Sequence, residues 1–189
     1  MIHVRLAAPR RAARVTGLIL GAALLRALLL PAGDLFSTIV FAGCLLAICL
    51  FERASATNES GWGRRKSLVA GLMAGAILLA PVVSGPLGAR PLSGFLPWAA
   101  IAAMVATLEE TSIRGVLYRR LAGEAGTIAA IFIGAAVFAL IHLPRYGLGA
   151  MPLDAAVGLA LGGLRALTGR VLPCAVAHTM ADWGAWFWA

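Results

Sequence analysis

Two adjacent glutamates and an arginine stand inside an apolar stretch of this chain, at Glu109, Glu110 and Arg114. An ionised side chain near the centre of a bilayer costs roughly 3 kcal/mol on insertion scales, so such groups usually face the interior of a helix bundle and serve function. On a helix, Glu110 and Arg114 share a face and can form an ion pair, whereas Glu109 points about 100° away. We therefore expect Arg114 to hold Glu110 and leave Glu109 available to a water molecule; a structural ion cluster is the alternative.

Two later segments place histidines at helical spacing from a second polar or aromatic residue. Phe138 and His142 are four residues apart, as are His178 and Asp182, so each pair shares one helical face. A carboxylate one turn from an imidazole can fix its tautomer. Each pair alone is equally typical of a structural contact between helices. Together with the glutamates, however, they place a candidate base and two imidazoles on three different predicted helices, which indicates hydrolysis.

These three motifs resemble those of the CAAX-protease and bacteriocin-processing family of intramembrane proteases, also called the Abi family. Its motifs are Glu-Glu-x-x-x-Arg, Phe-x-x-x-His, and His-x-x-x-Asn or Asp, and they stand here at 109–114, 138–142 and 178–182. The resemblance covers the motif-bearing core at about residues 95–188. It implies an intramembrane endopeptidase that hydrolyses a peptide bond in a membrane-associated precursor. Its best understood members, the prenyl-protein proteases, remove the three C-terminal residues after a lipidated cysteine.

The resemblance also implies roles for individual residues. Glu109 and His142 correspond to the pair that activates the attacking water, and His178 to a residue that stabilises the oxyanion. Glu110, Arg114, Phe138 and Asp182 correspond to supporting positions. Many members have Asn where this chain has Asp182, and an ionised carboxylate can only accept hydrogen bonds. We therefore expect Asp182 to orient and charge His178 rather than to contact the oxyanion.

Metal dependence and catalysis itself each have an alternative. A glutamate and two histidines can also bind zinc with a water in the open position, and the ligands of such a divalent metal are then Glu109, His142 and His178. No His-Glu-x-x-His signature is present, and we expect a metal-free, glutamate-dependent reaction. The alternative function is a non-catalytic membrane protein of the same fold, such as a bacteriocin self-immunity or scaffold protein; the intact motifs argue against it.

Composition indicates the elements that must position these residues. The 189 residues are 61% hydrophobic and 13% charged, with a mean hydropathy of +0.90. This predicts an all-α, polytopic transmembrane helix bundle of six or seven helices, as a single integral membrane domain over residues 1–189. The predicted spans lie near residues 15–31, 35–51, 68–84, 95–118, 127–143, 151–167 and 171–188, of which the sixth is the weakest.

The positive charges lie between the apolar runs, which indicates membrane topology. The net charge of +8 therefore does not predict nucleic-acid binding; the expected partners are membrane lipid and a membrane-associated protein or peptide substrate. By the positive-inside rule, these clusters predict a cytoplasmic N-terminus, in what we expect to be a bacterial inner membrane. The basic residues are Arg5, Arg10, Arg11, Arg14, Arg64, Arg65, Lys66, Arg119, Arg120, Arg165 and Arg170.

The predicted spans leave one inconsistency in depth. Counting the helical rise from the span ends puts Glu109 and His178 near the middle of the membrane, but His142 near its outer edge. Either the fifth helix starts later and is tilted, or the chain between residues 119 and 150 runs differently.

Overall fold

The computed structural model describes residues 9–52, 61–83 and 92–188, and these residues form helices without any strand. This confirms the predicted all-α bundle. The α-helices are α1 (Pro9–Leu29), α2 (Asp34–Phe51), α3 (Arg64–Val83), α4 (Phe95–Glu110), α5 (Tyr118–Tyr146), α6 (Met151–Thr168) and α7 (Leu172–Trp188). A π-helix, η3 (Thr111–Leu117), joins α4 to α5 without a break, and short 3₁₀ turns lie at 30–32, 92–94 and 148–150.

Four helical stretches of the described residues are long and apolar enough to cross a membrane. They cover residues 11–32, 34–51, 92–146 and 148–168. Large apolar side chains such as Leu28, Ile77 and Ile128 are exposed on the outside of the bundle, as expected where lipid replaces water as the solvent. The protein is therefore an integral membrane protein. α3 and α7, also predicted as spans, form helices that are not among these four stretches.

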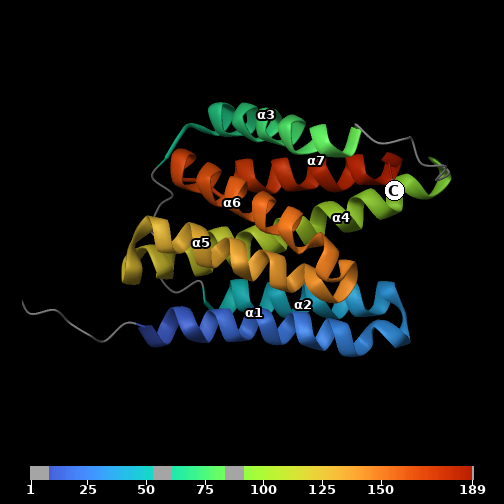
Figure 1. Cartoon of the computed structure of the whole chain (residues 1–189), viewed down its shortest axis with the longest axis horizontal. Helices are drawn as coiled ribbons and strands as arrows, with labels where there is room; N and C mark the ends of the chain where they lie inside the picture. Colours follow the sequence, from blue (N-terminus) through green and yellow to red (C-terminus); the bar gives the residue numbers. More distant parts are fainter. Residues whose placement is uncertain (1–8, 53–60, 84–91, 189) are drawn as a thin grey trace, which may run out of the picture.

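The helix that begins with α4 continues through residues 119–126, which lie between two predicted spans. It includes α4, η3 and the first turns of α5, and it ends at Gly126, whose φ of 88° and ψ of 167° break the helix. Such a positive φ favours glycine, which has no Cβ. The chain then reverses, and Glu109 and His142 lie almost equally far from Gly126 along the sequence. The longer fourth helical run therefore removes the expected mismatch in depth (Figure 1).

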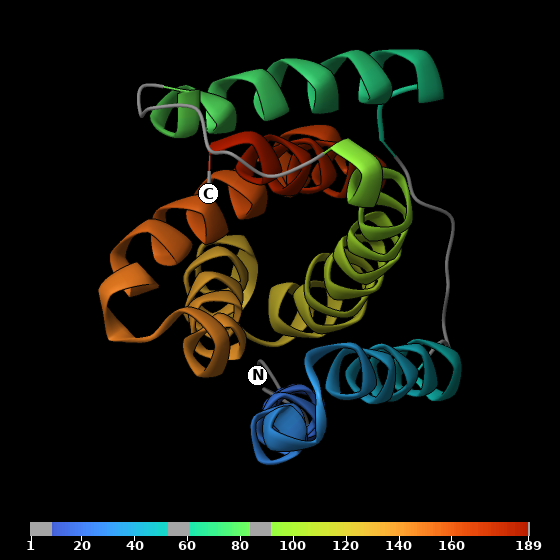
Figure 2. The ribbon, with the colours of Figure 1, turned by 90° about the vertical axis from the view of Figure 1, so that its right-hand side faces the viewer.

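Helices α4, α5, α6 and α7 surround the middle of the molecule, with α1 and α2 on one side and α3 on the opposite side (Figures 1 and 2). α1 packs on α5, α2 on α4, and α3 on α7. Glycines permit the closest approaches. A Cβ at Gly158 of α6 would lie 2.8 Å from the Cα of Ala135 in α5, and one at Gly71 of α3 would lie 2.9 Å from the Cα of Pro173 in α7. Small residues of this kind are typical of helix contacts in membranes.

The described basic clusters gather at one end of the bundle, where α1, α3 and α7 begin and where α2 and α6 end (Figure 1). There, Glu52 at the end of α2 bonds Arg14 of α1 and, at 2.6 Å, Arg120 of α5. Arg165 differs from the expectation that it belongs to a basic helix end, because it is buried inside the bundle. Arg5 and the parts of the chain between predicted spans at 53–60 and 84–91 lie outside the described residues.

Candidate active site

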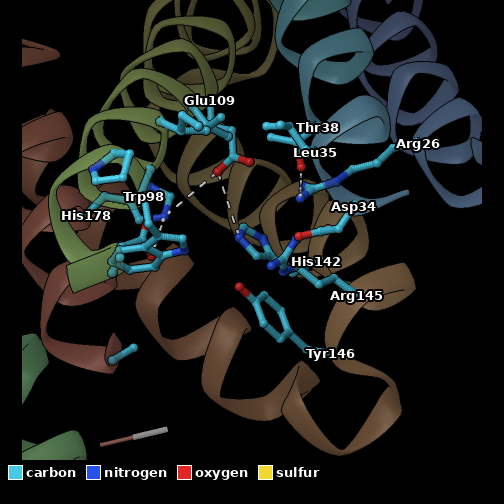
Figure 3. A pocket seen from close by; sticks show the side chains of 17 residues that line it. Arg26, Asp34, Leu35, Thr38, Trp98, Glu109, His142, Arg145, Tyr146 and His178 are labelled. Carbon is cyan, nitrogen blue, oxygen red and sulfur yellow. Dashed lines mark hydrogen bonds and ion pairs between the residues drawn. The ribbon is translucent and has the colours of Figure 1, made fainter. Parts of the chain in front are cut away.

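A cavity of about 380 Å³ lies in the half of the bundle opposite the basic clusters (Figure 3). It is formed by the last turns of α1 and α5, the first turns of α2, most of α4 as far as Glu109, and the part of α7 from His178 onward. About half of its lining residues are apolar, and eight titratable residues also line it. These are Arg26, Asp34, Glu109, His142, Arg145, Tyr146, His178 and Asp182.

The carboxylate of Glu109 faces both histidines in this cavity. Its Oε2 lies 3.8 Å from Nε2 of His142 and 3.8 Å from Nε2 of His178, and dashed lines mark both contacts in Figure 3. Glu109 is only 3% exposed, and no hydrogen bond joins its carboxylate to another described residue. The structure therefore brings together the three residues that the sequence predicted as catalytic. One ligand atom from each lies within 4.8 Å of the others, close enough to hold a metal ion.

The other nitrogen of each imidazole is held by an acceptor. Nδ1 of His142 lies 2.8 Å from the carbonyl oxygen of Phe138, one helical turn earlier. Nδ1 of His178 lies 3.1 Å from Oε1 of Glu110. Since a carbonyl and a carboxylate can only accept, each Nδ1 carries the hydrogen. Both Nε2 atoms are therefore directed at Glu109, where they can bind a water or a metal.

Glu110 and Arg114 form the buried ion pair that their spacing predicted. Nη1 of Arg114 donates to Oε1 of Glu110 at 2.9 Å, and the two side chains are 1% and 0% exposed. Nη2 of Arg114 donates to the carbonyl oxygen of Gly158 in α6 at 3.0 Å. The pair thus connects the α4–η3 junction to α6 and, through Glu110, to His178 in α7. The carbonyl of Arg114 in turn accepts from Nε of Arg165 at 2.9 Å.

Phe138 fills the space between this ion pair and the two imidazoles. Its ring centroid lies 4.4 Å from that of His142 and 5.2 Å from that of His178. The guanidinium of Arg114 lies over the same ring at 4.6 Å. Phe138 is buried, so its ring fixes the imidazoles by packing, while its backbone carbonyl is the acceptor for Nδ1 of His142. The predicted common face of Phe138 and His142 is confirmed.

The residue that orients the ring of His178 is Glu110, which bonds its Nδ1, and not the expected Asp182. Oδ1 of Asp182 lies 3.7 Å from Nε2 of His178, which is the nitrogen that also faces Glu109. Asp182 is one turn along α7, so its side chain reaches the near edge of the ring, whereas Glu110 approaches from inside the bundle. Asp182, which we expected to orient His178, therefore lies on the cavity side of that ring, and its side chain is 34% exposed.

Four titratable residues of the cavity were missed by the sequence reasoning: Arg26, Asp34, Arg145 and Tyr146. Arg145 and Asp34 form an ion pair at 2.5 Å that joins α5 to α2, and Tyr146 stacks on His142 with an interplanar angle of 13°. The spacing of Tyr146 from His142, four residues on one helix, carried a usable signal. The pairing of Asp34 with Arg145 did not, because the two residues are far apart in the chain.

A buried carboxylate that faces two imidazoles in a cavity of a helical membrane protein offers the groups that a membrane-embedded hydrolase needs. The family model described as type II CAAX prenyl endopeptidase Rce1-like matches residues 91–184, about half of the chain, and this region includes all three motifs. The chain belongs to this family of membrane endopeptidases. Comparison with the curated proteins and with the solved structures found no match.

The two adjacent glutamates should differ in their effect on stability. Glu110→Gln leaves the buried guanidinium of Arg114 without a charged partner, and breaking a buried pair in this way costs about 3–5 kcal/mol. Glu109→Gln removes no hydrogen bond and should leave stability unchanged or raise it, as is common for active-site carboxylates. Thermal unfolding of the two purified variants in detergent measures the difference. Equal destabilisation by both substitutions would contradict the division of roles.

Proposed function

We propose that this protein is an intramembrane endopeptidase in which Glu109 and His142 activate a water molecule and His178 stabilises the oxyanion. The observation that carries the proposal is the buried carboxylate of Glu109, which lies 3.8 Å from two imidazole nitrogens and has no hydrogen bond to another described residue. A buried carboxylate that makes no hydrogen bond has a cost that function explains better than structure does. Membership of an endopeptidase family supports the same conclusion.

The proposed water lies between Glu109 and His142. Both groups are acceptors on the cavity side, because Nδ1 of His142 gives its hydrogen to the carbonyl of Phe138. A water that donates one hydrogen to Oε2 of Glu109 and the other to Nε2 of His142 presents its lone pairs outward. A gap of 3.8 Å between these two atoms suits a bridging water whose two hydrogen bonds are each about 2.8 Å long.

The proposed reaction transfers one proton through Glu109. The water oxygen attacks the peptide carbonyl carbon while Glu109 takes a proton from the water. The carbonyl oxygen becomes an oxyanion, and an Nε2 hydrogen of His178 is placed to donate to it. This assignment is supported by three acceptors around one ring, since Glu110 faces Nδ1 while Glu109 and Asp182 face Nε2. Glu109 then gives its proton to the leaving nitrogen as the carbon–nitrogen bond breaks.

We propose that no metal takes part, although Glu109, His142 and His178 fit a divalent ion. These three side chains offer one oxygen and two nitrogens, a donor set that zinc accepts, and a bound zinc would supply Lewis-acid activation of water. The metal-free reading is favoured by His178, because a ring surrounded by three carboxylates is best satisfied with hydrogen on both nitrogens. A ring in that form cannot be a metal ligand.

The proposed substrate is a membrane-associated precursor, either of the CAAX prenyl type or with a C-terminal anchor or peptide that is processed. The cavity has mostly apolar walls and a volume of about 380 Å³, which is at the small end of the range for ligand sites. It therefore suits a short apolar segment of an extended peptide. A non-catalytic scaffold of the same fold remains the alternative that the experiments below address.

We further propose that the protein lies in a bacterial inner membrane with its N-terminus in the cytoplasm. The described basic clusters at one end of the bundle support this orientation, and the cavity then lies toward the outer side. A reporter active only outside the cytoplasm should be active when fused to the C-terminus and inactive when fused to the N-terminus. The reverse pattern would contradict the orientation.

Glu109→Gln should abolish cleavage while the protein stays folded. The amide keeps the size of the side chain but cannot take a proton, and general-base catalysis contributes roughly 10²- to 10⁴-fold to rate. Mass spectrometry of membrane-protein termini should show a precursor that accumulates uncut in cells with the variant and is cut in cells with the natural protein. An unchanged set of termini, together with an unchanged phenotype, would favour the scaffold.

Purified enzyme should remain active after treatment with a strong chelator. Added zinc should inhibit it, because zinc bound between Glu109 and Nε2 of His142 would displace the bridging water. Hydrolysis of a farnesylated peptide in detergent, measured before and after dialysis against the chelator, tests this expectation. Loss of activity that stoichiometric zinc restores would contradict the metal-free mechanism.

A further inference from the structure

Arg26 is a buried cation in the cavity that has no carboxylate partner among the described residues. It lies on α1, outside the region matched by the family model, and it is 8% exposed. Its Nη2 donates to the hydroxyl oxygen of Thr38 at 3.2 Å, and its guanidinium lies over the ring of Phe41 at 5.0 Å. Its Nε is buried and has no hydrogen-bond partner. Figure 3 shows the side chain reaching from α1 toward the cavity.

The second arginine of the cavity provides a contrast. Arg145 is paired with Asp34 at 2.5 Å, and its side chain is 32% exposed. A buried guanidinium without a counter-ion is costly, because its desolvation is not compensated. Arg26 is more buried than Arg145, but its only side-chain hydrogen-bond partner among the described residues is the neutral hydroxyl of Thr38. Arg145, in contrast, has the carboxylate of Asp34. An anion that enters the cavity would complete the set of partners of Arg26.

The geometry of a guanidinium selects the kind of anion. Nε–H and one Nη–H point in parallel and match the two oxygens of a carboxylate. On the function proposed above, the molecule that enters this cavity is a peptide whose scissile bond lies at Glu109. The same small cavity contains Arg26, so only a short stretch of peptide fits between the two residues.

We propose that Arg26 binds the α-carboxylate at the C-terminus of the substrate, so that the enzyme selects chains that end a few residues after the cut bond. This inference rests on the proposed endopeptidase function, and Arg26 acts as a specificity-determining residue. Thr38 holds one edge of the guanidinium in place. The competing explanation is that Arg26 only anchors α1 to α2 through Thr38 and Phe41.

Binding tests the proposal without requiring cleavage. The probe is a fluorescent peptide with a farnesyl-cysteine followed by three apolar residues, made either as the C-terminal acid or as the C-terminal amide. We expect the Glu109→Gln protein in detergent to bind the acid about 10- to 100-fold more tightly than the amide, the range for a charge-assisted contact in a buried site. An amide that ends in glutamate should not regain this affinity, because its carboxylate is on the side chain.

Substitutions of the two arginines assign the preference to one of them. In the Glu109→Gln background, Arg26→Gln should remove the preference for acid over amide, and Arg26→Lys should keep a smaller preference because it retains the charge but not the fork. Arg145→Gln is the matched control and should keep the preference. Thermal unfolding in detergent checks that each variant is folded, and Arg26→Lys provides the test if Arg26→Gln does not fold.

Three results would overturn the proposal. In the first, the acid and the amide peptide bind equally tightly or not at all. In the second, Arg26→Gln weakens the binding of both peptides by the same factor. In the third, Arg145→Gln removes the preference for the acid and Arg26→Gln does not. The last two would indicate an anchoring role for Arg26 or a carboxylate site at Arg145. Failure of the proposed function is separate: the natural protein would then bind the acid preferentially yet leave both peptides uncut.

Discussion

The buried ion pair between Glu110 and Arg114 is the interaction on which the site depends. Arg114 is 1% exposed and Glu110 fully buried, so neither charge is compensated by solvent. Together they connect three parts of the bundle: the α4–η3 junction that carries them, α6 through the carbonyl of Gly158, and α7 through His178. A buried charge pair contributes little net stability but strongly disfavours arrangements that separate it, so it fixes the position of α7 relative to α4.

Glu109 can remain without a hydrogen bond because its neighbour Glu110 makes the structural contacts. Glu110 pairs with the guanidinium of Arg114 and accepts from Nδ1 of His178. Nε2 of His178, on the cavity side of the ring, is therefore left for chemistry. In His142, Nδ1 likewise donates to the carbonyl of Phe138 on the same helix, so Nε2 faces the cavity. Rigid surroundings and an unsatisfied centre are what an active site requires.

The cavity contains two kinds of polar group with different placements. The motif residues come from α4, α5 and α7, whereas Arg26, Asp34 and Thr38 come from the first two helices. α1 and α2 carry no recognised motif, yet they form one wall of the cavity (Figure 3). The chemistry and the proposed recognition of the peptide terminus are thus divided between the motif-bearing core and the helices that precede it.

The sequence by itself determined the helical bundle and the common face of Glu110 and Arg114, because hydropathy and helical spacing are local properties of the chain. The resemblance of its motifs to those of a known family is what made Glu109, His142 and His178 candidates for catalysis. The tertiary structure decided what depends on helix ends and on contacts between distant segments. The helix that continues to Gly126 brought His142 level with Glu109. Because α7 packs against α4, Nδ1 of His178 bonds Glu110 and not Asp182. The packing of α1 places Arg26 in the cavity. No local pattern encodes these contacts, since they arise when separate helices are buried together.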